Sequence, residues 1–130
     1  MKTILGLDPG RDKCGLAIQN KQGKIIYHQI VDSQTAIVTI QRLCQEYKVE
    51  LVVMGDGTTS TTWHELLEAD LSNIPITTVI EKNSTLEARD RYWLMYPARG
   101  FKRLVPQSLR LPPRPVDDIV AILLIERYYQ

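Results

Sequence analysis

The chain has few cysteines and no long apolar run. Only two of its 130 residues are cysteine, Cys14 and Cys44, which is too few for a disulfide framework or a cysteine-based zinc site. We therefore expect both thiols to be reduced packing residues. No stretch approaches the roughly 18 apolar residues that a membrane span needs, and the chain begins directly with a strand pattern rather than a signal peptide. These absences predict a cytoplasmic protein that does not bind a membrane.

What is present is an ordinary globular composition, with 44% hydrophobic and 24% charged residues, and an uneven distribution of charge. The net charge is only +1, but residues 1–81 carry 7 Lys and Arg against 10 Asp and Glu, and residues 115–130 carry 1 against 3. Residues 82–114 carry eight cations against Glu87 and Asp90, a net of +6: Lys82, Arg89, Arg91, Arg99, Lys102, Arg103, Arg110 and Arg114. Such a cluster is typical of a surface that faces phosphates, although a solvated loop carries the same charges.

The spacing of apolar residues predicts a chain of both strands and helices. Three strands with short links, at 3–8, 15–19 and 24–31, indicate an antiparallel meander. A helix that Ser33 is placed to cap follows, then a strand at 51–55, a helix at 62–71 and a strand at 76–80. A Ser-x-x-Glu capping box at Ser84 begins a further helix that ends near residue 96. Residues 97–115, with five prolines, predict an irregular loop, and the apolar run 119–125 predicts a buried terminal helix.

This order of elements is that of the ribonuclease H-like topology. We therefore predict a single α/β domain over residues 1–130, with a five-stranded mixed sheet flanked by helices. Three of its strands are antiparallel and the last two are parallel.

Carboxylates stand at the ends of three predicted elements. Asp8 ends the first strand, Glu81 ends the last, and Asp117 with Asp118 opens the terminal helix. A cluster of such like charges favours a divalent cation, and oxygen-only ligands favour Mg2+ or Mn2+. Two ions about 4 Å apart can activate water and stabilise the leaving oxygen in phosphodiester cleavage.

Each carboxylate also has a simpler interpretation. Asp117 and Asp118 could complement the helix dipole, and adjacent helical residues diverge by about 100°, so only one of the pair would face a metal. Glu81 with Lys82 could be an exposed ion pair. The simpler interpretation is weakest for Asp8, because its flanks are apolar and rich in glycine.

Three blocks of the sequence resemble the YqgF (RuvX) family of RuvC-like nucleases: ILGLDPGRDKCGLAI, IEKNSTLEAR and PVDDIVAILLIERYY. The resemblance implies a ribonuclease H-like fold and either a Holliday junction resolvase, active in DNA recombination, or a nuclease that matures the 5′ end of 16S ribosomal RNA. It implies that Asp8, Glu81 and Asp117 hold two Mg2+ or Mn2+ ions. A resolvase of this kind would act as a symmetric homodimer, since two related cuts need two sites.

The chain departs from the family pattern in its second block. Ile80 stands where the family usually has an acid, and Lys82 replaces an arginine. Asp56, at the end of the fourth strand, is a competing ligand for Glu81, although a Gly-Asp-Gly strand-end turn is the more ordinary interpretation. Asp118 suits an alignment with RuvC better than Asp117, so both stay candidate catalytic residues.

The basic stretch begins beside the predicted metal site. Six cations are candidate nucleic-acid-binding residues: Arg11, Lys82, Arg89, Arg91, Lys102 and Arg103. The aromatic residues among them could stack on unpaired bases but more commonly belong to a core. His28 and His64 lack metal-like spacing, and we assign them no role. The main alternative to a nuclease is a nucleic-acid-binding module that keeps the fold without cleavage.

Overall fold

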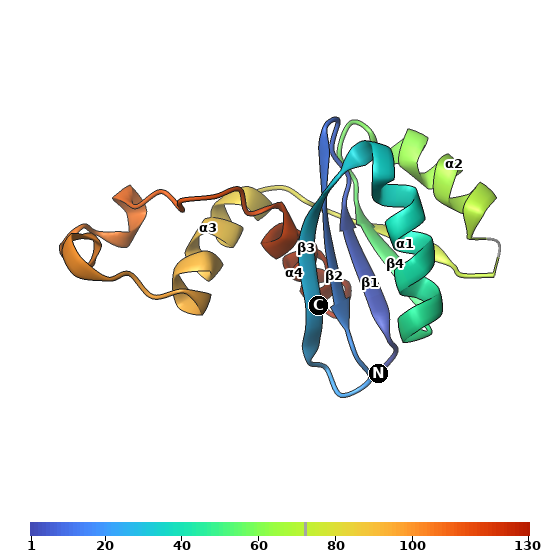
Figure 1. Cartoon of the computed structure of the whole chain (residues 1–130), viewed down its shortest axis with the longest axis horizontal. Coiled ribbons are helices and arrows are strands. Elements are labelled where there is room, and N and C mark those ends of the chain that lie inside the picture. Colours follow the sequence, from blue (N-terminus) through green and yellow to red (C-terminus); the bar gives the residue numbers. More distant parts are fainter. Residues whose placement is uncertain (72) are drawn as a thin grey trace.

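The computed structural model describes residues 1–71 and 73–130, and it contains the predicted five-stranded mixed sheet (Figure 1). The strands are β1 (Ile4–Asp8), β2 (Lys13–Gln19), β3 (Ile25–Asp32), β4 (Leu51–Gly55) and β5 (Ile76–Val79). Their order across the sheet is β3-β2-β1-β4-β5, in which β1 to β3 are antiparallel and β4 and β5 run parallel to β1. This topology confirms the predicted fold class.

In the described residues, α1 (Ser33–Tyr47) and α2 (Ser60–Asp70) cover one face of the sheet and α4 (Asp117–Tyr128) covers the other, while α3 (Ser84–Met95) lies against α4. One core lies between the sheet and the pair α1 and α2, and the other lies between the sheet and α4. α3 packs on α4 through Ala88, Tyr92 and Trp93 rather than on the sheet itself. The residues of α4 from Asp118 to Ile125 are all buried, as the apolar run predicted. No helix of the described residues is long and apolar enough to cross a membrane.

Two glycines allow α4 to lie very close to the sheet. A Cβ atom at Gly6 of β1 would lie 2.5 Å from the carbonyl oxygen of Ala121. A Cβ atom at Gly15 of β2 would collide with the main-chain carbonyl of Asp117. The absence of these two side chains therefore brings the beginning of α4 directly over the ends of β1 and β2.

The helices begin near the predicted residues, but their predicted caps are wrong. The residue before α1 is Asp32, and Ser33 instead donates a 2.9 Å hydrogen bond to the carbonyl of Gly10. The residue before α3 is Asn83, whose φ of 63° is left-handed, so Ser84 lies inside the helix and makes no capping-box bond. In both cases the residue directly before the predicted cap, Asp32 or Asn83, stands at the N-cap position instead.

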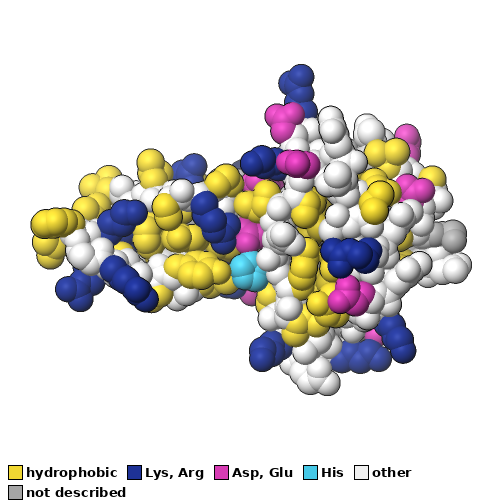
Figure 2. Space-filling view, viewed as in Figure 1, with side chains coloured by type: hydrophobic (Ala, Val, Ile, Leu, Met, Phe, Trp, Pro, Cys, Tyr) yellow, Lys and Arg dark blue, Asp and Glu magenta, His cyan; other side chains and the backbone are white. Residues whose placement is uncertain are grey.

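Residues 97–116 connect α3 to α4 and extend away from the sheet together with α3, and we call these residues the arm (Figure 1). The arm was predicted to be irregular, and it contains two short 3-10 helices, η1 (Gly100–Leu104) and η2 (Gln107–Leu109). Yellow apolar and dark blue cationic side chains are intermixed over this projecting part in Figure 2.

Candidate active site

Asp8 lies at the end of β1 on the face that α4 covers. Side chains alternate along a strand, so Ile4, Gly6 and Asp8 share this face. Burial and, to a smaller extent, the negative charges of Asp117 and Glu81 together raise the pKa of Asp8 to about 7. The negative charges of both other carboxylates predicted to form the site therefore act on Asp8.

Asp117 is positioned by the close approach of α4. Its carbonyl lies against Gly15, and Gly15 is the direct cross-strand partner of Asp8. Burial raises the pKa of Asp117, as does the charge of Asp118, whereas the nearby ammonium of Lys13 lowers it. Asp117 therefore stands above the same strand end as Asp8.

Glu81 follows β5 and is fixed by its main chain. Its N–H donates a 3.0 Å hydrogen bond to a carboxylate oxygen of Asp56, and its carbonyl accepts one of 2.9 Å from the N–H of Ser84. The guanidinium of Arg127 donates a 2.7 Å bond to the carbonyl of Ile80, just before Glu81. Burial and the charge of Asp56 raise the pKa of Glu81, whereas Arg127 lowers it.

Two glycines leave room for the Glu81 carboxylate. A Cβ atom at Gly55 or at Gly57 would collide with its oxygens. The sequence Gly55-Asp56-Gly57 thus has two roles in the structure: the glycines make space for the side chain of Glu81, and Asp56 binds its amide. One oxygen of the competing candidate ligand Asp56 is engaged in this bond.

Asp118 points to other partners. Its side chain is only 4% exposed, and Arg114 binds it with distances of 2.9 and 3.3 Å, while Nδ1 of His28 lies 2.6 Å from Oδ2. Burial opposes ionisation of Asp118, but the hydrogen bonds from Arg114 and His28 outweigh it and lower the pKa of Asp118. His28, to which the sequence analysis gave no role, thus ties β3 to α4 beside the site.

A hollow of about 330 Å³ connects Asp8 to Glu81. Its other lining residues come from the beginning of α3 and the turn before it: Lys82, Asn83, Ser84, Thr85 and Leu86. Within residues 1–71 and 73–130, no three His, Cys, Asp or Glu side chains lie close enough together to bind a metal ion. The carboxylates nevertheless fit one chemically, because they are oxygen ligands whose pKa values are all raised, and a hard divalent cation supplies the positive charge that would offset theirs.

The candidate nucleic-acid-binding cations fall into two groups. Five of them are exposed: Arg11, Lys82, Arg89, Lys102 and Arg103. Arg91 is not free, because its guanidinium binds both oxygens of Glu126 at 2.9 and 2.6 Å. A second ion pair, between Arg127 and Glu87 at 3.0 Å, joins the same two helices. Arg91, Glu126 and Arg127 therefore fix α3 on α4, a role that no short motif of the sequence indicated.

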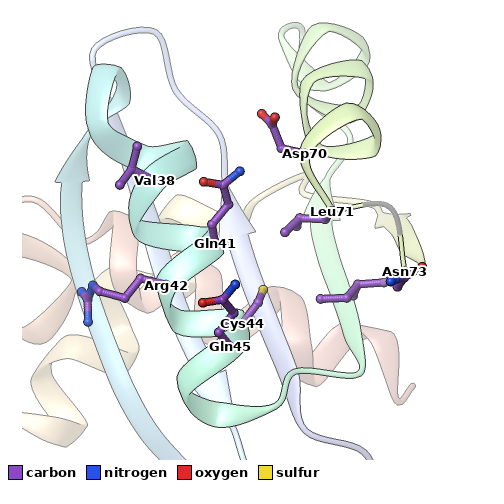
Figure 3. A pocket seen from close by; sticks show the side chains of 9 residues that line it. Val38, Gln41, Arg42, Cys44, Gln45, Asp70, Leu71 and Asn73 are labelled. Carbon is purple, nitrogen blue, oxygen red and sulfur yellow. The ribbon is translucent and has the colours of Figure 1, made fainter.

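Another hollow, of about 560 Å³, lies between α1 and α2 on the opposite face of the sheet (Figure 3). Figure 3 shows Gln41 and Gln45 of α1 and Leu71 beyond α2 along its walls. Burial raises the pKa of Cys44 in this hollow to about 11, so its thiol is not activated as a nucleophile. The candidate chemistry lies at the carboxylates, on the other side of the sheet.

Comparison with known proteins gives a consistent result. A family model described as "Tex protein YqgF-like domain" matches residues 2–87. The chain is 34% identical to Protein tex of Bordetella pertussis over 57% of this chain and 10% of that protein, and 35% identical to Protein YhgF of Escherichia coli over 46% and 8%. It spans about a tenth of the length of these curated relatives. The RuvC structure from Thermus thermophilus matches 94% of this chain and 89% of that chain with a TM-score of 0.59 at 17% identity, which confirms the ribonuclease H-like fold.

Proposed function

The chain belongs to the family of Tex protein YqgF-like domains, and from this premise we propose that it is a metal-dependent endonuclease acting on structured nucleic acid. A four-way DNA junction is the first candidate substrate, and the 5′ region of precursor 16S ribosomal RNA is the second. The observation that carries the proposal is the meeting of three element ends: Asp8 shares a hollow with Glu81, and the carbonyl of Asp117 lies against Gly15, the cross-strand partner of Asp8.

Asp8, Glu81 and Asp117 would hold the Mg2+ or Mn2+ ions of this reaction. When bound, such ions lower the pKa of water and stabilise charge on the leaving oxygen. Asp56 and Arg127 restrict the position of Glu81 by binding the N–H and the carbonyl of the peptide group that joins Ile80 to Glu81. Gly55 and Gly57 leave its carboxylate free to turn into the hollow shared with Asp8.

The substrate backbone would lie over the exposed cations near this hollow. Lys82 lines the hollow itself, and Arg89 lies further along α3 from it. Arg11 is exposed in the turn after Asp8, where it can bind a phosphate of the scissile strand. On a four-way junction two copies of the chain would be needed, because the paired cuts are related by a two-fold axis.

Cleavage of labelled substrates tests this proposal. A four-way junction and a precursor 16S RNA are each incubated with the protein in Mn2+ or in EDTA, and we expect Mn2+-dependent cutting of at least one. Asp8→Asn should abolish the cutting. Asp12→Asn is the matched control, because Asp12 is an exposed acid in the turn directly after Asp8. Cutting that survives Asp8→Asn would refute the catalytic assignment.

A second candidate function is nucleic-acid binding without cleavage. Two observations favour it. Among the described residues no three metal-binding side chains lie close together, and the carboxylate of Asp118 is bound to Arg114 and His28. In the same assay this module would bind the junction or the RNA but leave it intact in Mn2+. Binding and cutting are therefore measured on the same samples.

A further inference from the structure

The arm exposes large apolar side chains beside cations. Phe101 is 89% exposed and Leu104 82% exposed, the two highest values among the exposed large hydrophobic residues. Five cations lie between residues 97 and 116, and no acid does: Arg99, Lys102, Arg103, Arg110 and Arg114. A solvated loop would explain the cations but not the exposed Phe101 and Leu104.

The short helix η1 places these two side chains on one side. A 3-10 helix has three residues per turn, so residues three apart in sequence lie above one another. Phe101 and Leu104 are three apart within η1, and Lys102 and Arg103 lie between them. The tip of the arm therefore presents an apolar face with positive charges next to it.

Contacts with Trp93 of α3 and within the arm hold this tip in place. Lys102 and Arg110 both lie 5.7 Å from the centre of the Trp93 ring, which is buried between α3 and α4. Arg110 also donates a 2.8 Å hydrogen bond to the carbonyl of Val105. Because the tip is supported in this way, its apolar face is present before any ligand binds.

We propose that the tip of the arm binds unpaired nucleotides, with a base packed on Phe101 and Leu104 and the adjacent phosphates paired with Lys102 and Arg103. The positive charge complements a phosphate backbone, and an aromatic ring stacks on a base of any sequence. An intact duplex offers phosphates but no free base face, so the tip selects single-stranded segments such as tails, gaps or opened junction arms. This inference rests on the nucleic-acid binding of the proposed function but not on cleavage.

Fluorescence anisotropy in EDTA and low salt tests the proposal without any cutting. The probes are a labelled single-stranded oligonucleotide and the blunt duplex of the same sequence. We expect Phe101→Ala to weaken single-strand binding about tenfold, because the ring that stacks on a base is removed, and to change duplex binding by less than about twofold. Phe101→Tyr should bind like the wild type. Leu94→Ala is the matched control, since Leu94 is a 72% exposed apolar residue of α3 outside η1.

Three outcomes would overturn the proposal. Equal losses on the single strand and the duplex would mean that Phe101 does not contact a base. Absence of nucleic-acid binding by the wild type would remove the ligand class. The third outcome is that sedimentation shows a wild-type dimer that Phe101→Ala converts to a monomer while single-strand binding is unchanged. The tip would then serve self-association. A wild-type protein that binds the single strand but cuts neither substrate in Mn2+ would contradict the proposed nuclease and leave this inference standing.

Discussion

Replacing Asp8 by asparagine should stabilise the metal-free protein at neutral and alkaline pH. The pKa of Asp8 rises from an ordinary value of 3.8 to about 7 in the folded state, chiefly because the side chain is buried. One pKa unit corresponds to about 1.4 kcal/mol, so ionised Asp8 costs the folded protein about 4 kcal/mol at most. Relaxation of Asp117 and Glu81 reduces this cost, and we expect a gain of about 1–4 kcal/mol for Asp8→Asn at pH 8.

The sign of the pH dependence follows from the same difference. In the unfolded chain Asp8 loses its proton near pH 4, whereas in the folded protein it keeps it until about pH 7. The contribution of Asp8 to stability is therefore complete below about pH 4 and is lost as the pH rises through about 7. The free energy of unfolding of Asp8→Asn relative to that of the wild type should be near zero in acid, rise between about pH 4 and pH 7, and stay constant at higher pH.

Urea denaturation in EDTA at several pH values measures this advantage. Comparing the variant with the wild type cancels the titration of other groups, such as Asp118, whose pKa is lowered. Addition of Mn2+ at pH 8 should raise the free energy of unfolding of the wild type more than that of Asp8→Asn. An Asp8→Asn protein that is less stable than the wild type at pH 8 in EDTA would refute the electrostatic reasoning.

Three further predictions concern the residues around the carboxylates. Asp56→Ala should weaken Mn2+ binding measured by calorimetry. Asp56→Asn should preserve most of the binding, because an amide oxygen still accepts the hydrogen bond from the Glu81 N–H. A severe loss of Mn2+ binding in Asp56→Asn would instead identify Asp56 as a ligand. Gly15→Ala should lower the free energy of unfolding by about 1–3 kcal/mol or more, because the added methyl group meets the Asp117 carbonyl, and an unchanged urea midpoint would contradict this. Arg91→Ala should lower the free energy of unfolding by no more than about 1 kcal/mol, because the Arg91 and Glu126 side chains are 31% and 36% exposed. A larger loss in urea denaturation would mean that this pair contributes more than a surface ion pair.

The regular elements could be predicted from the sequence because their apolar periodicity reflects the cores they face. The strand Leu51–Gly55 was predicted at its observed bounds, and the uniformly apolar part of α4 is buried as expected. The two caps were wrong because contacts with particular residues of the folded chain compete with the capping bonds. The side chain of Ser33 binds Gly10, 23 residues away, and a left-handed Asn83 ends the turn before Ser84.

The supporting contacts of the site could not be predicted in the same way. Asp8, Glu81 and Asp117 were selected by their place at the ends of elements, which a sequence pattern records. The partners that fix them are distant in the chain: Asp56 lies 25 residues from Glu81, Arg127 47 residues from Ile80, and His28 90 residues from Asp118. No spacing rule connects such pairs, because they meet only in the folded chain. The pairing of β4 with β5 places Asp56 beside Glu81, and the packing of α4 on the sheet places Asp118 beside His28.

The root of the arm is tied to the protein at a sensitive point. Arg114, the last cation of the arm, binds Asp118, and Asp118 is joined by a single peptide bond to Asp117. The ion pair closes a short loop of main chain that contains Asp117. The attachment of the arm and the placement of a candidate metal ligand therefore depend on the same contact.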